Sequence, residues 1–281
     1  MNQQQKAAAF KNLHLQDGIF LMPNAWNAGS ACLLAEGGFS ALGTTSAGVA
    51  ASMGLADYEG NVSRELMLES VRAIVDAVDL PVNADLESGY GESAEQVGET
   101  TALAIAAGAV GGNIEDYAGV AANQSPLFAR AVAVERIRAA RKAADACGIP
   151  FTLTARTDCF MVPMADPFAE AVERANLFVE AGADCLFIPG AKDIGTIERL
   201  VRELNGPLTV VMGFSGPTMT VADLQSVGVR RISIGGSLAR ATFGLIRRAA
   251  TEMAQHGTFS FANDAIPDPE LRKFFTAVRA R

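Results

Sequence analysis

Four charged residues lie in segments that otherwise resemble buried strands. Asp85 and Glu87 stand two positions apart in VNADLESGYG, so in an extended strand both side chains point to one side. Glu115 ends the run GGNIE, and Arg156 ends TLTAR. Carboxylates gathered in one place repel each other unless a cation lies between them, and oxygen ligands favour Mg2+, with Mn2+ as the alternative. Arg156 offers a planar fork that matches a carboxylate.

A turn of small residues adds candidate groups for binding an anion. Thr45, Ser46, Ala47 and Gly48 form this turn after an apolar run, and their backbone N–H groups and hydroxyls can surround an anionic oxygen. Tyr117, which follows the segment of Glu115, is a candidate proton donor, with a packing role as the alternative.

The elements that must position these side chains follow a repeated pattern, in which a helix ends in glycine and a short apolar run comes next. Strands that alternate with helices predict a parallel sheet. We expect eight strands, at residues 19–24, 41–45, 81–87, 111–116, 151–157, 185–189, 208–212 and 231–235. Eight strands suit an α/β fold of the closed (β/α)8 TIM type, in which the chemistry gathers at the carboxyl ends of the strands; an open doubly wound sheet is the alternative.

The remaining elements are expected to surround a single barrel domain over residues 1–281. An N-terminal helix at 3–15 should precede the barrel, and a C-terminal helical extension at 259–281 should follow it. The segment DPFAEAVERANLFVEAG predicts a helix that Asp166 caps and Pro167 begins, with Arg174 on its polar outer face. The long stretch 117–132 predicts a lid over the functional end.

The charge balance argues against nucleic acid and membrane partners. The chain has 23 Lys and Arg residues against 31 Asp and Glu, a formal net charge of −8, and no basic run. Its N-terminus is polar and no stretch of about 18 apolar residues appears, so we expect a cytoplasmic protein. Four cysteines without CxxC spacing and only two histidines argue against a zinc site or a Ser-His-Asp triad.

Four phrases, taken together and in order, resemble the isocitrate lyase and phosphoenolpyruvate mutase superfamily. They are NAWNAGSACLLAEGGFSALGTTSAGVAASMGLADYEG, VNADLESGYG, GGNIEDYAG and TARTDCF. The resemblance implies a (β/α)8 barrel whose last helix is exchanged between the subunits of a homodimer or homotetramer. It also implies Mg2+ and a small-molecule carboxylic acid substrate of the 2-oxo or 2-hydroxy class.

The resemblance also implies roles for individual residues. Asp85 and Glu87 are similar to the metal-site pair of the family, with Glu87 where many members have Asp. Asp57 and Glu115 are similar to its outer metal-site acids. Residues that match substrate-binding positions are Thr45, Ser46 and Ala47 in the anion turn, Arg156 as the carboxylate-binding arginine, Asn123 in the lid, and Trp26 near the edge of the pocket.

One departure from the family bears on the reaction. The lid reads GVAANQSPLFA and lacks the Cys and Lys of the KKCGH or KRCGH lids, which speaks against classical isocitrate cleavage and against a mutase that depends on a lid lysine. Cys159 alternates away from Arg156 and is expected to pack in the core. The expected function is Mg2+-dependent cleavage of a carbon–carbon bond through an enolate. Phosphorus–carbon chemistry, by a phosphoenolpyruvate mutase or a phosphonopyruvate hydrolase, and non-catalytic binding of an oxo acid are the alternatives.

Overall fold

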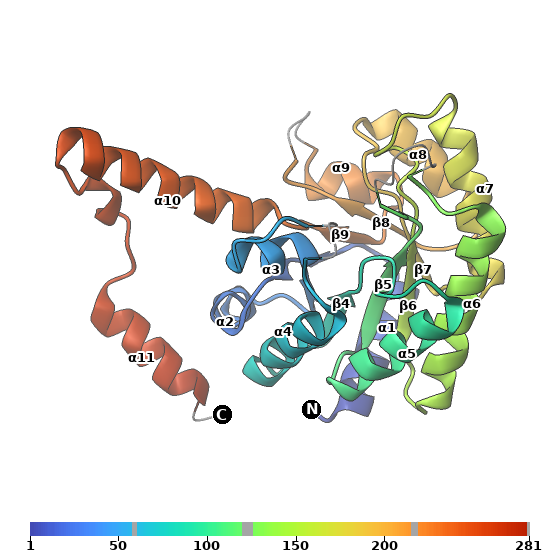
Figure 1. Cartoon of the computed structure of the whole chain (residues 1–281), viewed down its shortest axis with the longest axis horizontal. Helices are drawn as coiled ribbons and strands as arrows, with labels where there is room; N and C mark the ends of the chain where they lie inside the picture. Colours follow the sequence, from blue (N-terminus) through green and yellow to red (C-terminus); the bar gives the residue numbers. More distant parts are fainter. Residues whose placement is uncertain (58–60, 120–125, 215–218, 280–281) are drawn as a thin grey trace.

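In the part of the chain that the structure describes, residues 1–57, 61–119, 126–214 and 219–279, nine short parallel strands form one sheet that curls into a nearly closed barrel. This computed structural model has helices around the outside of the barrel (Figure 1). The strands are β1 (Phe20–Met22), β2 (Asn24–Ala25), β3 (Leu42–Thr44), β4 (Val82–Asp85), β5 (Gly111–Glu115), β6 (Thr152–Arg156), β7 (Cys185–Phe187), β8 (Leu208–Val211) and β9 (Arg231–Ser233). Their order is β1-β9-β8-β7-β6-β5-β4-β3-β2. The predicted TIM-type barrel is confirmed.

The first predicted strand is divided in two because Pro23 interrupts it. Proline has no N–H to donate to a neighbouring strand. Before Pro23, β1 pairs with β9; after it, β2 pairs with β3, where Asn24 lies opposite Gly43. Since only Pro23 separates β1 from β2, the two short strands join the edges of the sheet. The described strands therefore number nine instead of the expected eight, and the barrel topology is unchanged.

The described helices follow the strands along the chain. They are α1 (Gln3–Leu15), α2 (Ala28–Glu36), α3 (Ser46–Ser52), α4 (Arg64–Ala77), α5 (Ala94–Ala106), α6 (Arg130–Ala146), α7 (Pro167–Glu180), α8 (Ile194–Glu203), α9 (Val221–Ser226), α10 (Ser237–His256) and α11 (Asp268–Arg279), with a 3-10 turn, η1, at Ser260–Ala262. The predicted N-terminal helix is confirmed as α1. In α7, the Asp166 carboxylate accepts a hydrogen bond from the backbone N–H of Ala169 at 3.0 Å, and Pro167 opens the helix, as predicted.

The prediction for Arg174 is wrong, because this side chain is buried instead of facing solvent. Its Nη1 donates to Asp116 Oδ2 at 3.1 Å and to the carbonyl oxygen of Phe128 at 2.8 Å, while its Nε donates to Glu170 at 2.7 Å. Asp116 directly follows β5, so Arg174 ties α7 to the end of that strand. Helical periodicity places a residue on a face, but it carries no information about a carboxylate elsewhere in the chain that can pair with it.

The two faces of the strands differ in character. Ala84, Ile114 and Leu153 belong to the apolar core that packs beneath the helices. Neighbouring positions such as Asn83 and Thr154 are buried polar residues on the inside of the barrel. A polar interior that is closed to bulk solvent calls for hydrogen-bond partners, which the interior side chains supply to one another or a ligand can supply.

The helix α1 covers one end of the barrel and leaves the other end for the site. Phe10 packs against Ala41 and Val110, which immediately precede β3 and β5. The amino ends of the strands are thereby closed with apolar side chains. The carboxyl ends, where Asp85, Glu115 and Arg156 lie, remain for the functional site.

The helix α10 leads away from the barrel, and α11, in the C-terminal extension after it, lines a pocket together with residues of α2 and α4. In Figure 1, α10 projects away from the strands and α11 follows on a separate course. Large apolar side chains of α10 and of the extension are exposed, among them Ile246 on α10 at 59% and Phe259 at 67%. The predicted helical extension is therefore present, and an unusual amount of its apolar surface is uncovered. Among the described residues, no helix is both long and apolar enough to cross a membrane.

Candidate active site

A cavity of about 200 Å³ opens at the carboxyl ends of the strands. Six of the predicted site residues line it, and they come from different elements. Its lining includes Thr45, Ser46 and Ala47 after β3, Asp57 beyond α3, Asp85 of β4, Asn113 of β5 and Arg156 of β6. Side chains far apart in the sequence thus share one small space, as the barrel topology predicts.

Asp85 is held rigidly by its neighbours. Its Oδ2 accepts hydrogen bonds from the backbone N–H of Ser46 at 2.9 Å and from the Ser46 hydroxyl at 3.1 Å. Its Oδ1 accepts from Asn113 Nδ2 at 2.7 Å, and its own backbone N–H donates to Thr44 Oγ1 at 2.8 Å. The small-residue turn therefore binds Asp85 directly, and these contacts fix the orientation of the carboxylate within the cavity.

Glu87 does not lie on the strand as predicted, because β4 ends at Asp85. Glu87 and Tyr90 both have positive φ angles, 49° and 52°, which non-glycine residues adopt only when the surroundings enforce it. The Tyr90 hydroxyl donates to Glu87 Oε1 at 2.7 Å and stabilises this turn. Burial raises the pKa of Glu87 to about 7; the hydrogen bond from Tyr90 opposes the shift, and the charges of Asp57 and Asp85 add to it.

Arg156 lies between two carboxylates. Its Nε and Nη2 donate to the two oxygens of Asp158 at 2.7 and 3.0 Å, and its Nη1 lies 2.8 Å from Glu115 Oε2. Glu115 is buried, and its Oε1 accepts no hydrogen bond from the described residues. Burial raises the pKa of Glu115 well above its ordinary value; Arg156 opposes this shift, and the carboxylates of Asp158, Asp85 and Glu87 add to it.

The carboxylates around the cavity are candidate ligands for a divalent metal ion. Among the described residues, no three Asp, Glu, His or Cys side chains converge closely enough to bind one ion directly. Asp57 and Asp85 both line the cavity, and the unsatisfied oxygen of Glu115 is buried in the same acidic group. One or two carboxylates with the remaining positions taken by water is the arrangement that Mg2+ commonly adopts. The residues present fit Mg2+ bound in that way.

Five of the predicted site residues that the structure describes do not line the cavity: Glu87 and Glu115, whose contacts are given above, and Trp26, Gly48 and Tyr117. Trp26 is half-buried and packs against Val49 and Met67. Tyr117 packs against the main apolar core and forms an isolated antiparallel bridge with Leu127. At Gly48, a Cβ atom would lie 2.7 Å from Thr45 Cγ2 and 2.9 Å from Trp26 Cβ, so the absence of a side chain lets the turn pack closely.

Two predictions concern the lid and the cysteine after β6. Asn123 lies outside the described residues. The described ends of the lid come together, since the backbone N–H of Ala118 donates to the Pro126 carbonyl at 2.7 Å. Cys159 is fully buried, and burial raises the pKa of its thiol to about 11, so the predicted core role is confirmed.

Arg231 is a site residue that the sequence interpretation missed. It lines the cavity from β9 and is fully buried. Its Nη2 donates to Thr154 Oγ1 at 3.0 Å, and its Nη1 lies 3.1 Å from His14 Nε2. Burial and the charge of Arg231 lower the pKa of His14 to about 3, so the imidazole is neutral. The signal was the arginine at the start of the run RISIGG, where an apolar residue is usual.

Comparison with known proteins identifies the family. A family model described as phosphoenolpyruvate phosphomutase matches residues 10–254. The chain belongs to this family. Family relatives include 2-methylisocitrate lyase of Escherichia coli, which is 32% identical over 240 residues that cover 83% of this chain and 79% of the relative.

Solved structures of family members show the same fold. A Burkholderia cenocepacia protein assigned provisionally as a lyase or mutase is 45% identical, with a TM-score of 0.92 and coverage of 97% of this chain and 96% of that one. A 2,3-dimethylmalate lyase, described as a member of the phosphoenolpyruvate mutase and isocitrate lyase superfamily, is 26% identical, with a TM-score of 0.85 and coverage of 100% and 96%. The resemblance inferred from the sequence is confirmed, and the chain is an enzyme of the lyase and mutase type.

Proposed function

We propose that this enzyme cleaves a carbon–carbon bond in a small 2-oxo or 2-hydroxy di- or tricarboxylic acid, with Mg2+ as cofactor and Mn2+ as a possible substitute. The observation that supports this most is the meeting of Asp57, Asp85 and Arg156 on one cavity of about 200 Å³. The cavity suits a compact acid, because carboxylates for a metal and a cation for a substrate carboxylate line the same space.

The metal would be held by the acidic group of the cavity. Asp85 and Asp57 are the nearest candidates, and Glu87 and Glu115 complete the set, in part through water. When bound, Mg2+ supplies positive charge to the oxygen that becomes an enolate as the carbon–carbon bond breaks. Ser46 and Asn113 keep the Asp85 oxygens oriented by their hydrogen bonds.

The side chain of Arg156 would orient a substrate carboxylate. Its guanidinium is kept in one plane by the paired hydrogen bonds to Asp158, so it presents its charge to the cavity in a fixed position. Burial raises the pKa of Glu115 above its ordinary value, and its carboxyl group lies 2.8 Å from Arg156, whereas Tyr117 packs against the apolar core. Glu115 is therefore the better candidate for exchanging a proton with the substrate.

A turnover panel tests the proposal. Oxaloacetate, methylisocitrate, 2,3-dimethylmalate and phosphonopyruvate are incubated with enzyme and Mg2+, or with EDTA, and all products are followed by NMR. We expect metal-dependent cleavage of a carbon–carbon bond in one of the first three acids. The alternative is phosphorus–carbon chemistry, which the description of the matching family favours, and turnover of phosphonopyruvate alone would replace our proposal with it.

We also propose that the C-terminal extension packs against a second copy of the chain in a homodimer or homotetramer. The exposed apolar residues of α10 and of the segment after it, including Ile246, Met253 and Phe259, support this. A mass measurement in solution tests it, with the full chain compared to a form that ends after residue 257. A full chain that is monomeric at micromolar concentration would contradict it.

A further inference from the structure

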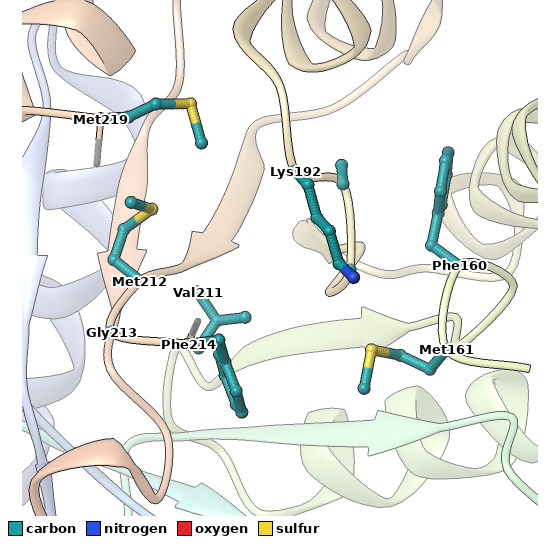
Figure 2. A pocket seen from close by; sticks show the side chains of 10 residues that line it. Phe160, Met161, Lys192, Val211, Met212, Gly213, Phe214 and Met219 are labelled. Atoms are coloured by element: carbon teal, nitrogen blue, oxygen red, sulfur yellow. The ribbon is translucent and has the colours of Figure 1, made fainter. Parts of the chain in front are cut away.

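A second pocket of about 290 Å³ lies beside the cavity (Figure 2). It is formed by the segments that follow β6, β7 and β8, and none of the acidic residues described above lines it. Its lining residues are Phe160, Met161, Gly190, Ala191, Lys192, Val211, Met212, Gly213, Phe214 and Met219. We call it the side pocket.

The side pocket and the cavity share part of their walls. Met161, Val211 and Phe214 line both spaces, so the two are neighbours. A molecule whose carboxylate lies at Arg156 would meet the side pocket at these shared side chains. Methionine adapts its shape to what it contacts, which suits a boundary of this kind.

The chemistry of the side pocket differs from that of the cavity. Apolar side chains make most of its wall, and Lys192 contributes the single charged group among the described lining residues. In Figure 2 the ammonium group of Lys192 points toward the space between Phe214 and Met161. An apolar pocket with one directed polar group is the usual form of a site that recognises a chain with a polar end.

Two observations describe Lys192 and the segment that carries it. Its side chain is exposed, and among the described residues it makes no hydrogen bond or ion pair. Gly190, two residues earlier, has φ +93°, and a Cβ there would lie 2.9 Å from Phe160 Cβ and 3.0 Å from Met161 Sδ. Only glycine fits at this point, and the segment of Lys192 thereby packs against the segment after β6.

We infer that the side pocket binds the distal part of the substrate: a hydrocarbon chain that contacts Met161, Val211, Met212 and Phe214 and ends in a carboxylate that pairs with Lys192. This rests on the proposed function, and it names the substrate class more narrowly. The substrate is a 2-oxo or 2-hydroxy acid whose side chain carries a second acid group beyond several methylene carbons. Each buried methylene strengthens binding about fourfold, and Lys192 selects the charged end.

The experiment compares 2-hydroxy and 2-oxo acids of equal chain length whose side chains end either in a carboxylate or in a methyl group. The readout is the ratio of kcat/KM for the carboxylate-ended acid to that for the methyl-ended acid. We expect wild-type enzyme to prefer the carboxylate, and Lys192→Met to lower this ratio about fivefold, the upper end for an exposed ion pair. Lys142→Met, an exposed position on α6, is the matched control.

A second variant tests the apolar wall of the side pocket. Met212→Gln keeps the length of the side chain and adds an amide, so it should lower the ratio of kcat/KM for long-chain acids to that for oxaloacetate about threefold. The inference is overturned if oxaloacetate is still cleaved while the carboxylate-to-methyl ratio is unchanged in Lys192→Met and the long-chain-to-oxaloacetate ratio is unchanged in Met212→Gln. That outcome would leave the proposed function intact.

Direct binding measurements test whether the side pocket binds the distal chain, independently of whether the enzyme catalyses the proposed cleavage. If no acid of the series is turned over, calorimetric titration with adipate and with hexanoate measures the affinity for each acid and needs no reaction. Tighter binding of adipate that Lys192→Met removes would support the inference while the proposed reaction fails. Equal binding of the two acids, or a preference that Lys192→Met leaves unchanged, would overturn it.

Discussion

Arg156 and Asp158 form two parallel hydrogen bonds, from Nε at 2.7 Å and from Nη2 at 3.0 Å, although only one residue separates them in the chain. The pair is possible because β6 ends at Arg156 and the backbone then turns. The N–H of Asp158 donates to Asp116 Oδ1 at 3.0 Å, so the turn is anchored to the end of the neighbouring strand. Arg156 is therefore fixed before any substrate arrives, which limits the entropy lost on binding.

Substitution of Arg156 is expected to reduce activity strongly. Arg156→Ala should lower kcat/KM by at least about 30-fold, which corresponds to about 2 kcal/mol for the loss of a partner to a buried carboxylate. Arg156→Lys should recover only part of this, because an ammonium group cannot pair with both oxygens of Asp158. Steady-state kinetics measure it, with Arg202→Ala on α8 as the control. Full activity in Arg156→Ala would refute the role.

Asp158→Asn should act through Arg156. The amide keeps the shape of the side chain but removes the charge that aligns the guanidinium, so we expect KM to rise about tenfold with a smaller change in kcat. Steady-state kinetics determine KM and kcat separately and so measure this effect. Asp184→Asn, which alters a carboxylate paired with Arg141 at another position, is the control. A fall in kcat at constant KM would argue against positioning of the substrate.

Ser46→Ala tests the support of the metal site. The variant keeps the backbone N–H bond to Asp85 and removes the hydroxyl bond of 3.1 Å. Loss of one partner of a metal-binding carboxylate typically weakens metal binding about 10- to 100-fold, and we expect a change near the lower end because the N–H remains. Calorimetric titration with Mg2+ measures it, and Ser70→Ala on α4 is the control. An unchanged affinity for Mg2+ would argue that Asp85 takes no part in binding the metal.

The sequence was sufficient to predict the barrel and the grouping of Asp85, Glu115 and Arg156. Parallel strands carry their carboxyl ends to one side, so a charged residue at the end of an apolar run is placed near the others without further information. The predicted strand that held Glu87 was too long by two residues. Alternation within a strand gives the side that a residue faces, but the end of the strand depends on contacts made after folding, such as the Tyr90 hydrogen bond.

Two buried arginines mark what the sequence could not provide. Arg174 was assigned to the outer face of a helix, and Arg231 was counted only as part of a strand. Each arginine is buried because it pairs with residues of distant segments. Arg174 pairs with Asp116, and Arg231 pairs with Thr154 and His14. A single sequence contains no signal for these pairings, since the partners lie between 58 and 217 positions away.

His14 should make stability depend on pH. In the folded chain its pKa is lowered to about 3 by burial and by Arg231, whereas the unfolded chain binds a proton near the ordinary value of 6.5. Below that value the unfolded state holds more protons, so the stability that neutral His14 provides is complete at higher pH and is lost progressively as pH falls from 6.5 toward 3. Between about pH 7.5 and about pH 5, we expect a loss of about 2 kcal/mol from this residue.

Urea unfolding at the two pH values measures this contribution. His14→Gln retains a polar acceptor for Arg231 but does not titrate, so its free energy of unfolding should change less between the two pH values than that of wild type. His256→Gln, which replaces the exposed second histidine at the end of α10, should behave as wild type. Carboxylates that titrate over the same range act equally in all three proteins and cancel in the comparison. If His14→Gln loses as much stability as wild type, the imidazole is protonated in the folded state and does not lie neutral beside Arg231.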